Sequence, residues 1–93
     1  MRKYELMLIL KPLLPQDIRE KVEDKIKETI EADGGKITKT DMWGKRHMSY
    51  SINGHEDGYY IVYELEASPK SIQEVKPKMT LTSEIIRYMF ILK

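Results

Sequence analysis

The chain has 93 residues, 41% of them hydrophobic and 33% charged, which predicts one folded domain over residues 1–93 with one core and a well-solvated surface. It has no cysteine, which excludes disulfide bonds and thiolate metal sites. Sixteen basic and fifteen acidic side chains leave a net charge of +1, which excludes nucleic-acid binding through a large basic excess. No apolar stretch is long enough to span a bilayer, and we expect a cytoplasmic protein that does not bind membranes.

The first third of the chain predicts a strand followed by a helix. Residues 2–10 have apolar side chains on both sides of a two-residue repeat, which predicts a central strand. Over residues 16–32 the period lengthens to about four, which predicts an amphipathic helix. Its apolar stripe consists of Ile18, Val22, Ile26 and Ile30. We expect the two glycines that follow Asp33 to end this helix.

The middle of the chain predicts a β-hairpin. Residues 36–53 are polar and favour a strand, with Gly44 as an expected bulge or bend. Residues 53–58 are rich in turn-forming types and predict the turn of the hairpin. Residues 59–67 then give the strongest strand signal in the chain.

The last third predicts a helix and a final strand. Ser68 and Pro69 have the order of a helix cap and a first helical residue. Pro77 lies inside this helix, and we expect it to kink or shorten the helix. Residues 85–92 form a last strand with apolar residues on both sides.

The order β-α-β-β-α-β predicts an α+β, ferredoxin-like fold, a four-stranded antiparallel sheet with two helices on one face. We expect the core to lie between the sheet and the helices. Six residues are predicted to belong to it: Leu6, Leu8, Leu10, Ile26, Ile30 and Leu65. The other face of the sheet is left open, and a partner normally uses such a face.

One segment of the expected hairpin combines basic and aromatic residues. Lys45, Arg46 and His47 are adjacent and lie between Trp43 and Tyr50. Phosphate oxygens need cationic donors and unstacked bases need flat surfaces, so this combination is typical of RNA binding. Ordinary solvated strands also mix basic and aromatic residues, and the segment alone does not separate the two interpretations.

Residues 44–53 resemble the signature of the small-subunit ribosomal protein six family, with Met48 at a position where leucine is usual. The resemblance includes residues 2–5, 58–60 and 85–89 and covers the chain from residue 1 to residue 93. It implies a structural protein of the small ribosomal subunit, with no catalytic activity and no cofactor. The family joins small-subunit ribosomal protein eighteen as a heterodimer and binds the central domain of small-subunit ribosomal RNA.

We therefore expect a monomer when the chain is isolated and a heterodimer with that partner. We also expect a cytoplasmic, ribosome-associated protein, and the sequence is also compatible with an organellar ribosome. A basic partner would supply much of the phosphate contact, which accounts for the net charge of only +1.

The predicted site residues fall into two classes. The predicted RNA-binding residues are Arg2, Lys3, Lys45, Arg46, His47 and Arg87. The predicted partner-interface residues are Trp43, Tyr50 and Tyr60. For each cation the alternative is a solvated charge on a strand, and for Arg46 it is an ion pair with an acid such as Asp41. Tyr50 and Tyr63 are also well explained as packing residues.

The sequence offers no catalytic or metal-binding cluster. His47 and His55 are the only histidines, and no carboxylates surround them at the spacing of metal ligands. Gly34, Gly35 and Lys36 lack the first glycine and the Ser/Thr of a phosphate-binding loop, and they follow a helix instead of a strand. The alternative function, which the fold alone permits, is a small-molecule or metal-sensing domain. The signature over residues 44–53 favours the ribosomal function.

Overall fold

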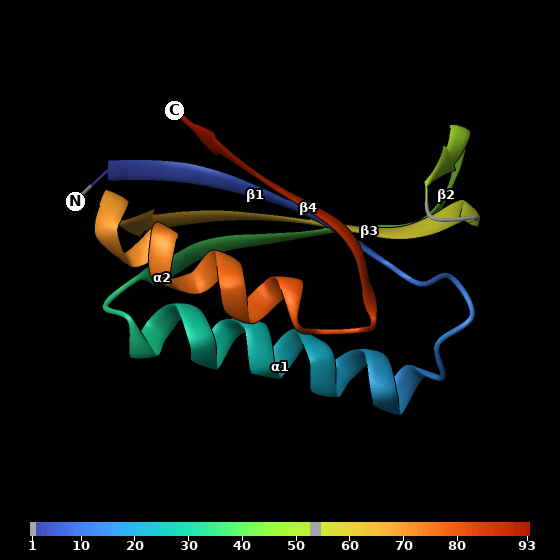
Figure 1. Cartoon of the computed structure of the whole chain (residues 1–93), viewed down its shortest axis with the longest axis horizontal. Helices are drawn as coiled ribbons and strands as arrows, with labels where there is room; N and C mark the ends of the chain where they lie inside the picture. Colours follow the sequence, from blue (N-terminus) through green and yellow to red (C-terminus); the bar gives the residue numbers. More distant parts are fainter. Residues whose placement is uncertain (1, 53–54) are drawn as a thin grey trace.

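A computed structural model describes residues 2–52 and 55–93, and the side chains of residues 48–56 lie outside its description. Its elements are β1 (Arg2–Leu10), α1 (Gln16–Ala32), β2 (Lys36–Ile52), β3 (His55–Ala67), α2 (Pro69–Thr80) and β4 (Ile85–Leu92). The strands form one antiparallel sheet in the order β2-β3-β1-β4, and both helices cover the same face of it (Figure 1). The predicted ferredoxin-like fold is confirmed.

The core lies between the sheet and the two helices. All six predicted core residues belong to it, and each is at most 2% exposed. The helices add Val22 from α1 and three residues of α2, Ile72, Val75 and Met79. Burying one such side chain contributes roughly 1.5–3 kcal/mol, so this core fixes both helices on one face of the sheet. Nothing in the described part of the chain covers the opposite face (Figure 1).

The helix ends follow from local residues. Gly34 has a φ of 86°, a conformation that glycine adopts without strain, and it ends α1 as predicted. At the start of α2, the hydroxyl of Ser68 accepts a hydrogen bond from the backbone N–H of Ser71 at 3.1 Å, and Pro69 is the first helical residue. None of the helices described is long and apolar enough to cross a membrane.

The expectation that Pro77 shortens α2 is wrong, because the helix continues to Thr80. A kink at Pro77 stays a prediction. Pro77 has no N–H, so the carbonyl of Gln73 loses its usual helical donor. Val75 and Met79, on either side of Pro77, are both buried in the core. Their burial holds this turn against the sheet and outweighs the loss of one hydrogen bond.

The predicted turn over residues 53–58 is wrong for residues 55–58, which belong to β3. Arg46 is opposite Gly58 in the register of β2 and β3. Backbone pairing across the hairpin therefore overrides the turn-forming composition of this segment. Since β1 ends where Leu10 meets Tyr59, residues 46–52 and 55–58 form a two-stranded arm that extends past the end of β1 (Figure 1).

Gly44 marks a bulge in β2, as predicted. The register with β3 shifts between Met42 and Gly44, and the φ of Gly44 is 79°. Such a conformation strains any residue with a Cβ. A bulge bends its strand and increases the local twist, so the strand changes direction as it enters the arm.

Candidate nucleic-acid and protein interface

The sheet face opposite the helices, called here the open face, carries most of the predicted site residues. Side chains alternate between the two faces of a sheet, and residues opposite one another in antiparallel strands share a face. Leu6 and Leu8 of β1 face the helices. The β1 residues that therefore belong to the open face are Lys3, Glu5, Met7 and Ile9.

The register divides the open face into three zones. The basic end contains Lys3, Lys36, Glu66 and Lys93. The middle zone contains Glu5, Lys39, Asp41, Glu64 and the apolar residues Met7, Val62, Met89 and Ile91. The arginine end contains Ile9, Trp43, Arg46, Gly58, Tyr60, Ile86 and Arg87. Charge is thus placed unevenly, with cations at both ends and most of the exposed apolar surface between them.

Lys93 bridges two carboxylates where the basic end meets the middle zone. Its ammonium group lies 3.7 Å from Oε2 of Glu5 and donates a hydrogen bond to Oε1 of Glu64. This hydrogen bond lowers the pKa of Glu64 and raises the pKa of Lys93. The three side chains are wholly or partly exposed to water, where such pairs contribute little stability, and the main effect is to hold them in place.

A hollow of about 190 Å³ lies on the open face beside this network. Its walls come from neighbouring strands and include an indole ring, an aliphatic side chain and several charged groups. It is lined by Glu5, Lys39, Asp41, Trp43, Val62 and Glu64.

An aromatic stack lies at the arginine end. The rings of Trp43 and Tyr60 are nearly parallel, with centroids 6.3 Å apart and an interplanar angle of 11°. Tyr60 packs against Ile9 and Ile86, which form a second, small apolar cluster. Trp43 is still 42% exposed. The structure thus brings together two of the predicted interface residues and leaves one indole accessible.

The side chain of Ile9 leans over Gly58 at this end of the sheet. A Cβ added to Gly58 would lie 2.4 Å from Cγ2 of Ile9. Only glycine fits this close approach. Ile9 therefore covers Gly58, the residue that lies opposite Arg46 in the register.

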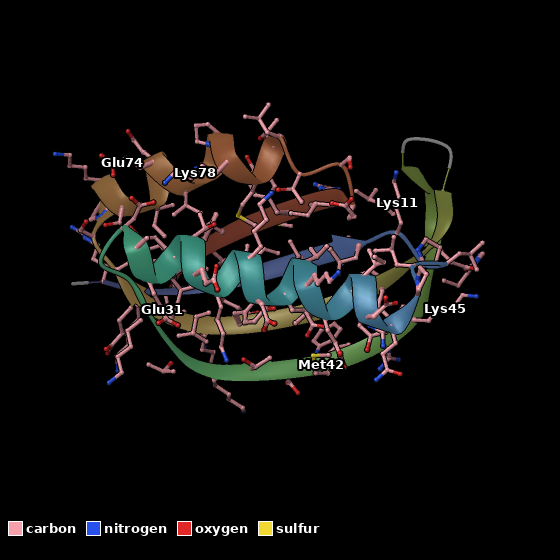
Figure 2. The ribbon with its side chains drawn as sticks, turned by 90° about the horizontal axis from the view of Figure 1, so that it is seen from below. Lys11, Glu31, Met42, Lys45, Glu74 and Lys78 are labelled. Atoms are coloured by element: carbon pink, nitrogen blue, oxygen red, sulfur yellow. The ribbon has the colours of Figure 1, made fainter. Side chains whose placement is uncertain are left out.

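Two of the three side chains in the predicted basic run over residues 45–47 contact an acid, and the third does not. Asp57 of β3 lies 2.9 Å from Nδ1 of His47 and 3.9 Å from Nζ of Lys45. Figure 2 shows Lys45 at the same end of the molecule as Lys11. Arg46 is exposed and forms no ion pair with any residue that the structure describes, so the alternative pair with Asp41 does not form there.

The predicted RNA-binding residues do not form one patch. Arg2 and Lys3 begin β1, whereas Arg87 pairs with Ile9 near its far end. Lys3 and Ile9 are six positions apart, which corresponds to roughly 20 Å along a strand. Arg46 and Arg87 therefore lie at one end of the open face, whereas Lys45 and His47 lie on the other face of β2, and the first two cations of the chain lie at the opposite end of the sheet. Their contact with RNA stays a prediction.

Tyr50 lies in β2, but its side chain is outside the described residues. Two further apolar residues were not predicted as part of the interface. Met89 and Ile91 lie on the open face and are 40% and 42% exposed. The sequence signal that could have found them is the two-residue repeat of β4, once its partner strand is known.

On the helix side of the sheet, the shifted pKa of Tyr63 and the contact between Arg19 and Tyr59 are explained by packing in the core. Tyr63 is buried, and burial raises its pKa, with the negative charges of Glu23 and Asp24 acting in the same direction. The guanidinium of Arg19 lies over the ring of Tyr59, 4.2 Å from its centroid. Within residues 2–52 and 55–93, no three His, Cys, Asp or Glu side chains come together as metal ligands. We therefore place the candidate site on the open face.

Comparison with known proteins gives consistent matches over nearly the whole chain. The profile of the family described as "Ribosomal protein S6" matches residues 3–92. Small ribosomal subunit protein bS6 of Corynebacterium aurimucosum is 42% identical over 87 residues, which cover 94% of this chain and 91% of the relative. The same protein of Carboxydothermus hydrogenoformans is 35% identical over 91 residues, covering 98% and 95% of the two chains.

Two solved structures share the fold. The crystal structure of 30S ribosomal protein S6 from Thermotoga maritima has a TM-score of 0.93 at 32% identity, covering 99% of this chain and 87% of that one. The C-terminal domain of the MgtC protein from Mycobacterium tuberculosis has a TM-score of 0.66 at 8% identity, covering 100% and 88%. This second likeness shows the fold alone.

Proposed function

The chain belongs to the ribosomal protein S6 family, and from this premise we propose that it binds the central domain of small-subunit ribosomal RNA together with small-subunit ribosomal protein eighteen. It is a protein of the small ribosomal subunit. Its role is structural and involves no catalysis. It works on the ribosome in the cytoplasm, and it is a monomer until it joins its partner.

The observation that carries the proposal is the exposed apolar surface of the open face. Trp43, Met89 and Ile91 are each at least 40% exposed there. Small soluble proteins rarely leave large apolar side chains together on an uncovered face unless a partner covers them. We therefore assign the middle zone and the Trp43–Tyr60 stack to the protein partner, with Tyr50 as a further interface residue.

The charge of the chain supports sharing the RNA contact. A protein with a net charge of +1 displaces few counterions when it binds RNA, so it gains little affinity from their release. Apart from Lys39, the cations of the open face lie at its two ends, where RNA can reach them beside a docked protein. The proposed RNA contacts are Arg2, Lys3, Lys45, Arg46, His47 and Arg87.

The test measures the affinity for a central-domain RNA fragment, with and without the purified partner, at several salt concentrations. We expect weak binding by the isolated chain and much tighter binding by the heterodimer, with a steeper dependence on salt. Equal affinity with and without the partner would contradict the proposal. A rise in melting temperature with small metabolites or metal ions, but not with RNA and partner, would instead favour the sensor function that the fold permits.

A further inference from the structure

The hollow on the open face lacks one positive charge. Three carboxylates line it, from Glu5, Asp41 and Glu64, and one ammonium group, from Lys39. Lys93 lies between the first and the last of these carboxylates. Three negative charges against two positive ones leave one negative charge uncompensated, and a single added cation would neutralise the site.

The uncompensated charge is that of Asp41. Glu5 and Glu64 share Lys93, and Lys39 lies opposite Glu64 in the register and acts on its carboxylate. Asp41, by contrast, makes no hydrogen bond or ion pair with the described part of the chain. Asp41 is exposed and lies opposite Val62 in the register. Its carboxylate is therefore open to a group that arrives from outside.

The other residues that line the hollow indicate which kind of chemical group could bind to Asp41. Trp43 and Val62 supply an aromatic ring and an aliphatic surface next to Asp41. Lysine and arginine combine an apolar stem with a cationic end, and both ends also bind favourably to an indole ring. The volume of about 190 Å³ suits one such side chain and is smaller than the roughly 300–1,000 Å³ of most small-molecule sites.

We propose that this hollow receives one lysine or arginine side chain of the protein partner, with its charged end on Asp41 and its stem against Trp43 and Val62. The inference rests on the proposed function, because the occupant belongs to the basic protein that docks on the open face. RNA is disfavoured here, since its phosphates would meet a carboxylate that no cation compensates.

The experiment compares Asp41→Asn with Glu28→Gln, which removes the same charge from an exposed position on α1, in the helical layer. Purified small-subunit ribosomal protein eighteen from the same source is titrated into each variant. Calorimetry measures the affinity, and the fluorescence of Trp43, the single tryptophan, reports docking next to the hollow. We expect Asp41→Asn to weaken partner binding by at least about tenfold, the low end of the range for a close charge pair. Glu28→Gln should stay within about twofold, as expected for a remote exposed charge.

The outcomes separate the inference from the proposed function. If the partner binds the wild type and Asp41→Asn equally tightly, the hollow does not hold a partner cation and the proposed function is unaffected. If the partner does not bind the wild type, the proposed function fails and this inference fails with it. If Asp41→Asn strengthens RNA binding and leaves partner binding unchanged, RNA covers the hollow and the inference is wrong. Melting temperatures equal to that of the wild type confirm that the variants are folded.

Discussion

Replacing Arg46 by glutamate separates a binding role from a stabilising one. Arg46 is exposed, faces Gly58 across the hairpin and has no ion pair among the residues that the structure describes. Surface substitutions of this kind change the free energy of unfolding by less than about 0.5 kcal/mol. For a domain of this size, that corresponds to a melting temperature lowered by at most about 4 °C.

The effect of Arg46→Glu on assembly should be much larger. The substitution removes one cation from the arginine end and introduces a charge that phosphate repels. One lost phosphate contact lowers the slope of log K against log salt by about 0.9. Together with the repulsion, we expect the heterodimer to bind its RNA about tenfold more weakly at moderate salt, within the range of about 1–3 kcal/mol for a specific contact.

The assay measures both quantities on the same variant, with Lys25→Glu on α1 as a control that reverses an equal charge in the helical layer. Thermal unfolding gives the stability, and filter binding at four salt concentrations gives the affinity and the slope. Normal RNA binding with a large loss of melting temperature would refute the reasoning. It would mean that the stem of Arg46 packs on the sheet and that its charge serves the fold.

Three further predictions follow from packing and charge. Leu8 is fully buried, so Leu8→Ala should lower the free energy of unfolding by about 2–5 kcal/mol, measured by urea denaturation. Gly58→Ala should cost about 1–3 kcal/mol because its Cβ meets Ile9, and Ile9→Ala in the same chain should relieve part of that cost. The Glu64 carboxyl should titrate below its ordinary pKa of 4.5 because Lys93 donates a hydrogen bond to it, and Lys93→Gln should raise its pKa back toward that value, as followed by carboxyl NMR. The stability from this pair is present above the ordinary pKa and is lost as the pH falls through the lowered one.

Each of these predictions has a control or a contrary outcome. Leu13 is 85% exposed, and Leu13→Ala should leave stability unchanged, so an equal loss at Leu8 and Leu13 would argue against the described core. Additive effects of the substitutions at Gly58 and Ile9 would show that the two sites do not touch. A Glu64 pKa that does not respond to the loss of Lys93 would contradict the bridge between them.

Much of the fold was predictable because its signals are local. The bounds of β1, α1 and β4 follow from the period of their apolar residues alone. The start of α2 follows from the Ser68 hydroxyl and the proline after it. These features depend on residues within one or two turns of each other, so no knowledge of the tertiary structure is needed.

Two errors arose where tertiary contacts override local preference. Residues 55–58 have the composition of a turn, yet they pair with β2 and extend β3 to His55. Pro77 has the local signal of a helix break, yet α2 continues because Val75 and Met79 are buried on the sheet. Both outcomes depend on a partner surface that is distant in sequence.

The candidate site was predictable in its residue types but not in its arrangement. The sequence suggested the cations and aromatics, but only the register shows that Lys3 and Arg87 lie at opposite ends of the sheet. The pairing of His47 with Asp57 likewise depends on how β2 and β3 align. Local sequence patterns do not determine register between strands, so the charged zones appear only in the folded chain.

The position of β1 in the sheet has a consequence for how the chain is made. β1 is synthesised before the other three strands, yet it lies between β3 and β4, and Leu6 pairs with both Tyr63 and Phe90. Pairing between such distant segments is slow, because the entropy of closing a long loop must be overcome first. Until residues 85–92 have left the ribosome, one edge of β1 has no partner strand. During its own translation, a nascent chain of this protein therefore exposes an apolar strand edge that can aggregate. Pairing of β4 with β1 covers this edge.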